Sequence, residues 1–180
     1  PVPFGGAGRT HGIFVSENAT LKMTDSRVTA LHGSGGIDGV QDGVGIRAGS
    51  TAANTTGNLD LDNVTVDDFQ KNGIDVDRTG SSATITNSTV AGIGPTSILA
   101  QNGIFADYGA DLTVTNSTIK DLSYTPATWA SIGIGPYDSG TVVIDNNQFI
   151  GVDEGVYAVT SSNPVTPKAL SITNNTFSNN

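Results

Sequence analysis

The segment ATITNST at residues 83–89 returns as LTVTNST at residues 112–118, and related segments occur four more times in the chain. Aligned on their apolar positions, the six copies begin at residues 21, 59, 83, 112, 142 and 170, which gives steps of 38, 24, 29, 30 and 28 residues. Positions one, three and eight are almost always apolar, and position five is Asn in every copy except the first, which has Asp25. Repeats with a period of about 20–50 residues are typical of solenoids and propellers, so this feature constrains the fold more than any other.

A second element, Gly followed by an apolar residue, precedes most copies of the first. It occurs as HGIFV (11–15), VGIRA (44–48), NGIDV (72–76), NGIFA (102–106), IGIGP (132–136) and EGVYA (154–158). Alternation of apolar residues predicts strands, so each unit contains three short strands. A propeller blade needs about 40 residues in four antiparallel strands. The shorter units therefore predict an all-β chain, a parallel β-helix of about six coils that forms one domain over residues 1–180.

The composition agrees with strands and tight turns, and it excludes several other classes. The 23 Gly residues and the many Asn and Thr residues argue against a helical protein. The absence of Cys excludes disulfides and thiolate metal sites. A formal charge of -9 with only eight Lys and Arg residues argues against a nucleic-acid partner. No apolar run approaches the roughly 20 residues of a membrane span.

The Asn at position five has a physical explanation in a short turn that requires a positive φ. Asn adopts that left-handed conformation more readily than other non-glycine residues. Stacked Asn side chains can also hydrogen-bond from coil to coil. We therefore expect one ladder at this turn, made of Asp25, Asn63, Asn87, Asn116, Asn146 and Asn174.

The same alignment predicts the core as inward-facing rows. The first strand contributes Ile13, Val15, Ile46, Ile74, Val76, Ile104, Ile134 and Val156. The second contributes Leu21, Met23, Leu59, Leu61, Ile85, Leu112, Val114, Ile144, Leu170 and Ile172. The third contributes Val28, Val66, Val90, Ile119, Phe149 and Phe177, followed by Leu31, Phe69, Ile93, Leu122 and Val152.

The GI-x-V and T-N-S-T blocks resemble the repeats of right-handed parallel β-helices of the pectin-lyase-like superfamily, over residues 11–177. That superfamily includes pectate lyases, polygalacturonases, alginate epimerases, phage tailspikes and bacterial surface proteins, so the resemblance implies a fold rather than a function. It also implies that a substrate would bind along the first strand and its flanking loops. The segment KNGIDVDRT (71–79) is similar to a polygalacturonase motif, but Asn72 replaces the catalytic Asp, and no His-Gly or Arg-Ile-Lys block follows.

Charged residues gather on the outward face of the predicted first strands. Arg47, Asp75, Asp77 and Asp107 lie on adjacent coils, which are about 4.8 Å apart, so they should form one patch. Paired carboxylates can act as general acid and base in glycoside hydrolysis. The three Asp side chains could instead hold Ca²⁺, and a lyase would use Arg47 or a neighbour as proton acceptor. The simplest alternative is a surface ion pair between Arg47 and Asp75 that stabilises the fold little.

Seven aromatic residues are expected on or beside the same face. Aromatic rings with a polar tip favour binding surfaces, and sugars stack on such rings. The alternative for the two residues in the loop 120–131 is that they pack that loop against the protein. The candidate ligand-binding residues are Phe14, Phe105, Tyr108, Tyr124, Trp129, Tyr137 and Tyr157.

The sequence thus predicts a secreted or cell-surface structural or adhesion module that contacts a polysaccharide or cell-surface glycan through the first-strand face, without a cofactor except for the Ca²⁺ alternative. A polysaccharide lyase or glycoside hydrolase that uses Asp75, Asp77 and Asp107 is the main alternative. A solenoid also needs caps, because its end coils expose core and strand edges. We therefore expect either a segment of a longer chain or a subunit that stacks head to tail into a fibre.

Overall fold

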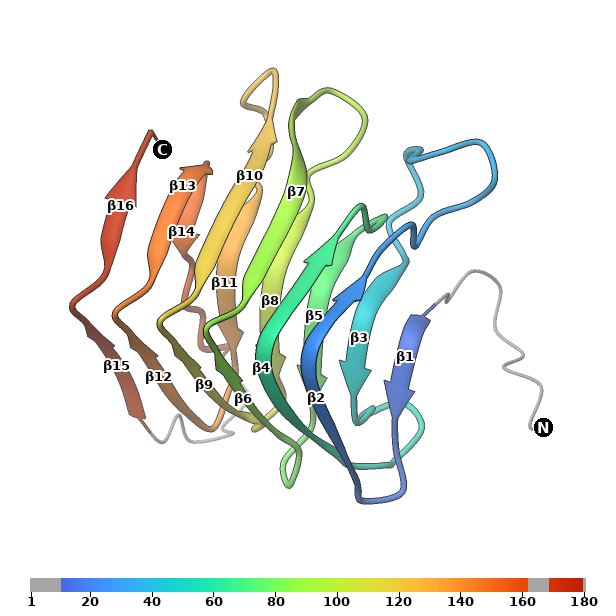
Figure 1. Cartoon of the computed structure of the whole chain (residues 1–180), viewed down its shortest axis with the longest axis vertical. Helices are drawn as coiled ribbons and strands as arrows, with labels where there is room; N and C mark the ends of the chain where they lie inside the picture. The colour runs from blue at the N-terminus through green and yellow to red at the C-terminus, as the bar shows by residue number, and fades with distance from the viewer. Residues whose placement is uncertain (1–10, 162–168, 180) are drawn as a thin grey trace.

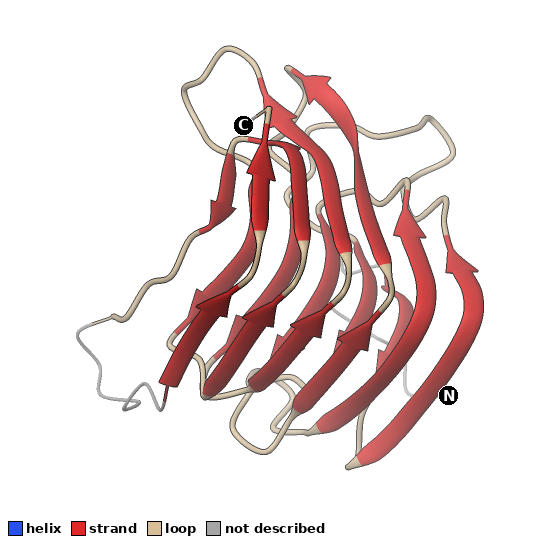
Figure 2. Ribbon diagram, turned by 60° about the vertical axis from the view of Figure 1, so that its left-hand side comes forward, coloured by secondary structure: helices blue, strands red, loops and turns tan. Residues whose placement is uncertain are grey.

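In a computed structural model, described for residues 11–161 and 169–179, the chain winds into a solenoid of parallel strands. Its strands form a six-stranded sheet, which we call sheet A, and a ten-stranded sheet, which we call sheet B. Figure 2 shows the coils stacked one on the next, with a sharp bend that divides sheet B into two flat halves. The all-β parallel β-helix that the repeat predicts is therefore confirmed.

Sheet A contains the first strand of every coil, in the order β1 (His11–Val15), β3 (Val44–Ala48), β5 (Asn72–Asp77), β8 (Asn102–Asp107), β11 (Ile132–Tyr137) and β14 (Glu154–Val156). Sheet B contains β2 (Ala19–Val28), β4 (Gly57–Asp67), β6 (Ser82–Thr86), β7 (Thr89–Thr96), β9 (Asp111–Thr115), β10 (Thr118–Tyr124), β12 (Thr141–Asp145), β13 (Gln148–Val152), β15 (Ala169–Thr173) and β16 (Thr176–Ser178). In the first two coils, the second and third strands expected from the sequence are continuous, as β2 and β4, because these strands pair on both sides of the bend.

Strand pairing places equivalent residues of successive coils directly above one another. Ile46, Ile74, Ile104 and Ile134 pair in one row of sheet A, and each is at most 1% exposed. Most of the other residues of the predicted core fill the interior in the same way, with residues of both sheets in one contiguous apolar cluster. Burial of these side chains supplies the main driving force for folding.

The Gly of the second repeat element is required by close packing between coils. A Cβ atom at Gly73 would lie 2.7 Å from the carbonyl oxygen of Gly103, and one at Gly103 would lie 2.5 Å from that of Gly133. Contacts this short do not occur for real Cβ atoms, so a side chain at this row would push the coils apart. The repeated Gly therefore marks where sheet A begins rather than a flexible turn.

The turn at position five has the backbone that the sequence predicts. All six residues have a positive φ, between 48° at Asp25 and 56° at Asn174. The side chains form only part of the expected ladder. Asn63 donates to Asp25 and Asn146 donates to Asn116, each over 2.7 Å, whereas Asn87 and Asn174 donate to Asp62 and Asp145 of the preceding coil. The six turns thus share one backbone conformation, whereas their side chains make different hydrogen bonds.

A continuous buried ladder lies one residue later, at position six. The backbone N–H of Ser88 donates to Ser117 Oγ, that of Ser117 to Asn147 Oδ1, and that of Asn147 to Asn175 Oδ1, over 3.1, 2.9 and 2.8 Å. Asn147 Nδ2 also donates to the carbonyl oxygen of Val114. Because this ladder satisfies backbone groups inside the protein, its loss would leave buried polar atoms without partners.

Two predictions about the core differ from the structure. Ile93 is 43% exposed, because β7 has one residue more than β10 at this point, so that Gly94 rather than Ile93 pairs with Leu122. At the last coil, Leu170, Ile172 and Phe177 belong to the inward rows but remain about half exposed, because only one described coil packs against them. Phe177 stacks on Phe149 with ring centres 4.6 Å apart.

The described residues contain no helix that is long and apolar enough to cross a membrane.

The buried ladder can be tested against the exposed turn beside it. We expect Asn147→Ala to lower the free energy of unfolding by about 2 kcal/mol or more, because it leaves buried backbone groups unsatisfied. Asn146→Gly, a matched control that keeps a positive φ available, should cost less than about 1 kcal/mol. Urea unfolding followed by circular dichroism measures both. Equal losses for the two variants would contradict the assignment of the ladder to position six.

Candidate functional site

The outer face of sheet A brings the predicted functional residues into two rows. Phe14, Arg47, Asp75, Phe105 and Gly135 pair in the first row, in that order. Asp77, Asp107 and Tyr137 pair in the second row. The patch of one Arg and three Asp residues predicted from the repeat is therefore present.

Arg47 lies between two carboxylates of the neighbouring coil. Its guanidinium is 3.3 Å from Asp75 and 2.7 Å from Asp77, and its Nε donates to the carbonyl oxygen of Gly49. The side chains of Arg47 and Asp75 are only 11% and 8% exposed, so this is not the weak surface pair that was the alternative from sequence. Removing one partner of such a buried pair leaves an uncompensated charge, which is strongly destabilising.

Asp77 is held on both carboxylate oxygens. Thr51 donates its backbone N–H to Asp77 Oδ2 over 3.0 Å and its hydroxyl to Asp77 Oδ1 over 2.6 Å. Thr51 comes from the loop that joins β3 to β4, where Ser50 and Thr55 pair across a tight turn. These bonds, together with the contact to Arg47, fix the orientation of the Asp77 side chain.

The surroundings of Asp107 change its pKa. Burial, followed by repulsion from Asp75 and Asp77, raises the pKa of Asp107 to about 8, although Arg47 acts in the opposite direction. Its Oδ1 atom is buried and has no hydrogen-bond partner among the described residues. A pKa of about 8 favours the protonated form of this side chain at neutral pH, and a proton donor beside two further carboxyl groups suits general acid–base chemistry.

These side chains form the floor of a hollow of about 420 Å³. Gln41, Asp42 and Gly43 from the loop between β2 and β3 form one wall. Thr51 and Ala52 form another, and Tyr108 lies at the rim. Lys71 lines this hollow at the start of β5, where burial lowers the pKa of its ammonium group and the group donates to the carbonyl oxygen of Ala100.

A second hollow of about 540 Å³ adjoins the first, since Gln41 and Lys71 line both. Its walls are more apolar and include Ile98, Leu99, Tyr124 and Trp129. Trp129 is 74% exposed, so it does not pack its own loop against the protein, which was the alternative from sequence. The two hollows together present acids and a cation at one end and aromatic rings at the other.

The seven predicted aromatic residues are divided among several places on this side of the molecule. Tyr124 and Trp129 line the second hollow, whereas Tyr108 and Tyr137 meet edge to face with ring centres 6.1 Å apart near the first. Phe105 lies over Gly135, where a Cβ atom would be 2.7 Å from its ring. The other two residues are Phe14, which stacks on His11, and the half-exposed Tyr157.

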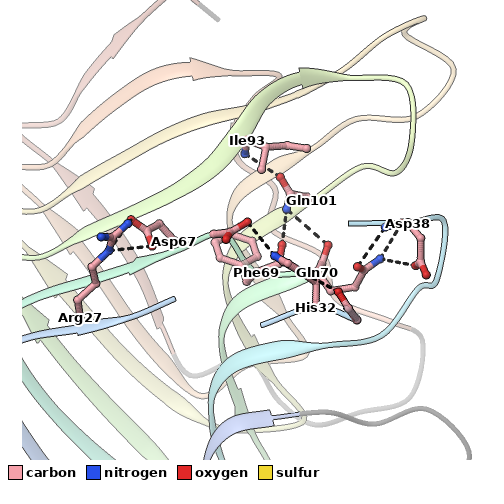
Figure 3. A network of polar contacts seen from close by, with 10 residues as sticks. Arg27, His32, Asp38, Asp67, Phe69, Gln70, Ile93 and Gln101 are labelled. Carbon is pink, nitrogen blue, oxygen red and sulfur yellow. Dashed lines mark hydrogen bonds and ion pairs between the residues drawn. The ribbon is translucent and has the colours of Figure 1, made fainter. Parts of the chain in front are cut away.

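The loops that wall the hollows come from one side of the solenoid. Figure 1 shows the long connections β2–β3, β7–β8 and β10–β11 projecting together where sheet B leads into sheet A. Gln70, which is 4% exposed, anchors the β2–β3 loop (Figure 3). Its amide nitrogen donates to the carbonyl oxygens of Asp38 and Val40, and its amide oxygen accepts from the backbone N–H of Asp38. The Gly/Asp-rich segment 33–46 is therefore anchored beside the first hollow.

Polar side chains, the buried Gln101 and the partly exposed Asp153, anchor the other two loops as well. Gln101 accepts from the backbone N–H of Ile93 and donates to the carbonyl oxygen of Phe69 (Figure 3). Asp153 accepts from the backbone N–H groups of Tyr124 and Ser131, over 2.7 and 3.0 Å, and so holds both ends of the loop that carries Trp129. The walls are thus pre-organised, which reduces the entropy cost of binding a ligand.

Metal binding finds no support here. Within residues 11–161 and 169–179, no three His, Asp or Glu side chains are placed to hold a metal ion. Arg47 occupies the space between Asp75 and Asp77 that a cation would need. We therefore propose no site for the Ca²⁺ that the three Asp residues suggested.

The residues of the site that were missed from the sequence include Gln41, Asp42, Thr51, Lys71 and Gln70. Each lies in a segment between the repeat elements or at its end, where the repeat predicts no side-chain direction. The repeat gives no signal for Gln70, because it lies three residues before Gly73, whereas Gln101 of the next coil lies two residues before Gly103.

Comparison with known families identifies one match. A family model described as a right-handed β-helix region matches residues 45–180, which is most of the chain. No curated protein and no solved structure matches the chain.

The charge state of Asp107 predicts how stability depends on pH. Its pKa is raised in the folded state, so the folded protein holds a proton that the unfolded chain releases from about pH 4 upward, and stability falls as the pH rises toward 8. We expect Asp107→Asn, which cannot ionise, to gain stability relative to the wild type between pH 5 and pH 8. Urea midpoints at several pH values measure this difference. A constant difference over that range would show that Asp107 titrates normally.

Proposed function

The chain belongs to the right-handed β-helix family, and we propose that it is an extracellular or cell-surface β-helix module that binds a carbohydrate on the outer face of sheet A. The observation that carries this proposal is the pair of adjoining hollows, about 420 and 540 Å³, beside the first strands. Volumes of this size are in the range of small-ligand sites, which fall between about 300 and 1,000 Å³.

The chemistry of the lining suits a saccharide. A sugar ring has one face of C–H bonds, which stacks on aromatic rings, and a rim of hydroxyl groups, which needs donors and acceptors. Trp129 and Tyr124 supply the rings in the second hollow, and Asn102 contributes an amide at its floor. In the first hollow, the lining includes the polar side chains of Asn72 and Asp42.

The scaffold, rather than the hollows, supports the proposed role in adhesion or display. A solenoid holds its surface loops at fixed spacing, because each coil is locked to the next by parallel pairing along the whole stack. Such a rigid surface suits the binding of an extended polymer. The enzymatic motifs of the superfamily are absent from the sequence, which favours binding over turnover.

Trp129 provides the test of glycan binding. We expect the wild-type protein to bind at least one polysaccharide in a glycan screen, and Trp129→Ala to weaken that binding about tenfold or more, since a stacked aromatic ring contributes over 1 kcal/mol. Thr113→Ala, a change on the outer face of sheet B, should leave the affinity unchanged. An unchanged affinity in Trp129→Ala would remove the second hollow from the binding site, and no binding to any glycan would overturn the proposal.

A second candidate function is glycoside hydrolysis, which one specific observation favours: Asp107, whose pKa is raised by burial, lines the same hollow as Asp75 and Asp77. In that reaction Asp107 would donate its proton to the glycosidic oxygen as the sugar–oxygen bond breaks. Asp75 would take a proton from the attacking water, so that one water is consumed and two sugar ends form. The lyase alternative fits less well, because Arg47 is already held by two carboxylates and is not available as a proton acceptor.

Turnover separates the two candidates. If the protein is a hydrolase, it should release reducing ends from the glycan that it binds, with a rate that falls in Asp107→Asn by about a hundredfold or more. The expected affinity of that variant for a neutral glycan is close to the wild-type value, since Asn replaces a protonated carboxyl. Binding without any release of reducing ends, measured over days, would leave the binding module as the function and exclude hydrolysis of that glycan.

A further inference from the structure

Acidic side chains outnumber basic ones in the first hollow, which is lined by Asp42, Asp75, Asp77 and Asp107 against Arg47 and Lys71. Arg47 already contacts Asp75 and Asp77, at 3.3 and 2.7 Å. Lys71 donates from its ammonium group to the carbonyl oxygen of Ala100, and burial lowers its pKa. A carboxylate group on a sugar would therefore meet cations that already have partners, among an excess of carboxyl groups.

Acceptors, in contrast, are available around the same space. Asp107 has a buried Oδ1 atom with no hydrogen-bond partner among the described residues. Asp42 at the wall accepts only from the backbone N–H of Gly43 in the described part of the chain. Asp138 of the next coil adds negative charge near Asp107, and the chain as a whole carries a formal charge of -9. The field in the hollow thus favours a ligand that brings N–H donors and positive charge.

The aromatic second hollow sets a further requirement for the ligand. The second hollow is lined by Tyr124, Trp129 and aliphatic side chains and holds only one charged residue, Lys71, which it shares with the first. A ligand that extends through both hollows needs an uncharged face for the rings and a positive group at one end. A uniformly charged polymer would meet this condition less well than one whose ring faces remain apolar.

We propose that the glycan bound by this face is an amino-sugar polymer, with an ammonium-bearing sugar in the first hollow against Asp107 and Asp42 and a neighbouring sugar ring on Trp129 in the second. This inference rests on the proposed function, because it assigns the chemical class of the glycan that sheet A binds. It predicts the opposite preference to a polyuronide site, which would place free Arg or Lys side chains toward the sugar.

Binding of an ammonium group has a consequence for Asp107. A positive charge beside this carboxyl stabilises its ionised form, against the opposing influence of Asp75, Asp77 and Asp138. Below pH 8, where the free protein holds the proton, binding should therefore release it. A neutral sugar has no such influence and should bind without proton release.

The test compares three tetrasaccharides of equal length by calorimetry at pH 5.5, where the amino groups of glucosamine are already charged, and at low salt: glucosamine, N-acetylglucosamine and galacturonate. We expect the glucosamine tetramer to bind about tenfold or more tighter than the N-acetylated one, because a charge-assisted hydrogen bond is stronger than a neutral one, and the galacturonate tetramer to bind weakest. Raising the salt concentration should weaken only the glucosamine tetramer appreciably. Titrations in two buffers of different ionisation enthalpy should show close to one proton released with glucosamine.

Variants assign the effect to Asp107. Asp107→Asn should abolish the proton release and bring the glucosamine affinity close to that of the N-acetylated tetramer. Asp60→Asn, which removes the same charge from the outer face of sheet B, should change neither. Equal or tighter binding of galacturonate, or an unchanged preference for glucosamine in Asp107→Asn, would overturn the inference. If only the N-acetylated tetramer binds, the inference fails while the proposed glycan binding stands; if none of the three binds, the inference also fails, and the wider glycan screen decides on the proposed function.

Discussion

Parallel pairing in a fixed register from coil to coil is the constraint on which the rest of this structure depends. Each coil must bend at the same two places, or its strands would slip past those of its neighbours. The bend within sheet B is set by a residue of positive φ at position five, and the start of sheet A by a Gly whose neighbour's carbonyl leaves no room for a side chain. The buried ladder through Ser88, Ser117 and Asn147 then satisfies the backbone groups that the bend leaves inside.

Register also creates the candidate site. Residues that are about 30 positions apart in the sequence become neighbours across a single strand spacing, which is why Arg47 reaches Asp75 and Asp77 and why Asp107 lies next to Asp77. The interior rows cannot change without loss of packing, whereas the outer rows and the three long loops are free of that restriction. The acids and rings are therefore placed by the scaffold, and hydrogen bonds from Gln70 and Gln101 and to Asp153 hold the walls around them.

The repeat allowed the fold, the positive-φ turn, the core rows and the outward patch to be predicted from the sequence. Prediction from the repeat failed at the positions where the repeat is interrupted. Ile93 follows an additional residue in β7, which reverses its direction relative to the aligned Leu122. The walls of the hollows could not be predicted either, because Gln41 and Thr51 belong to loops whose course depends on hydrogen bonds to distant coils. The shift of the ladder to position six was missed because Ser and Asn at that position look like ordinary turn residues until their burial is known.

We propose that the two hollows joined at Gln41 and Lys71 form one glycan site on sheet A. The decisive experiment is a crystal structure of the protein with a glucosamine tetramer. We expect sugar density that extends through both hollows, with one ring against Trp129 and an amino group within hydrogen-bond distance of Asp107. Density confined to sheet B or to the ends of the solenoid, with both hollows filled only by water, would contradict it.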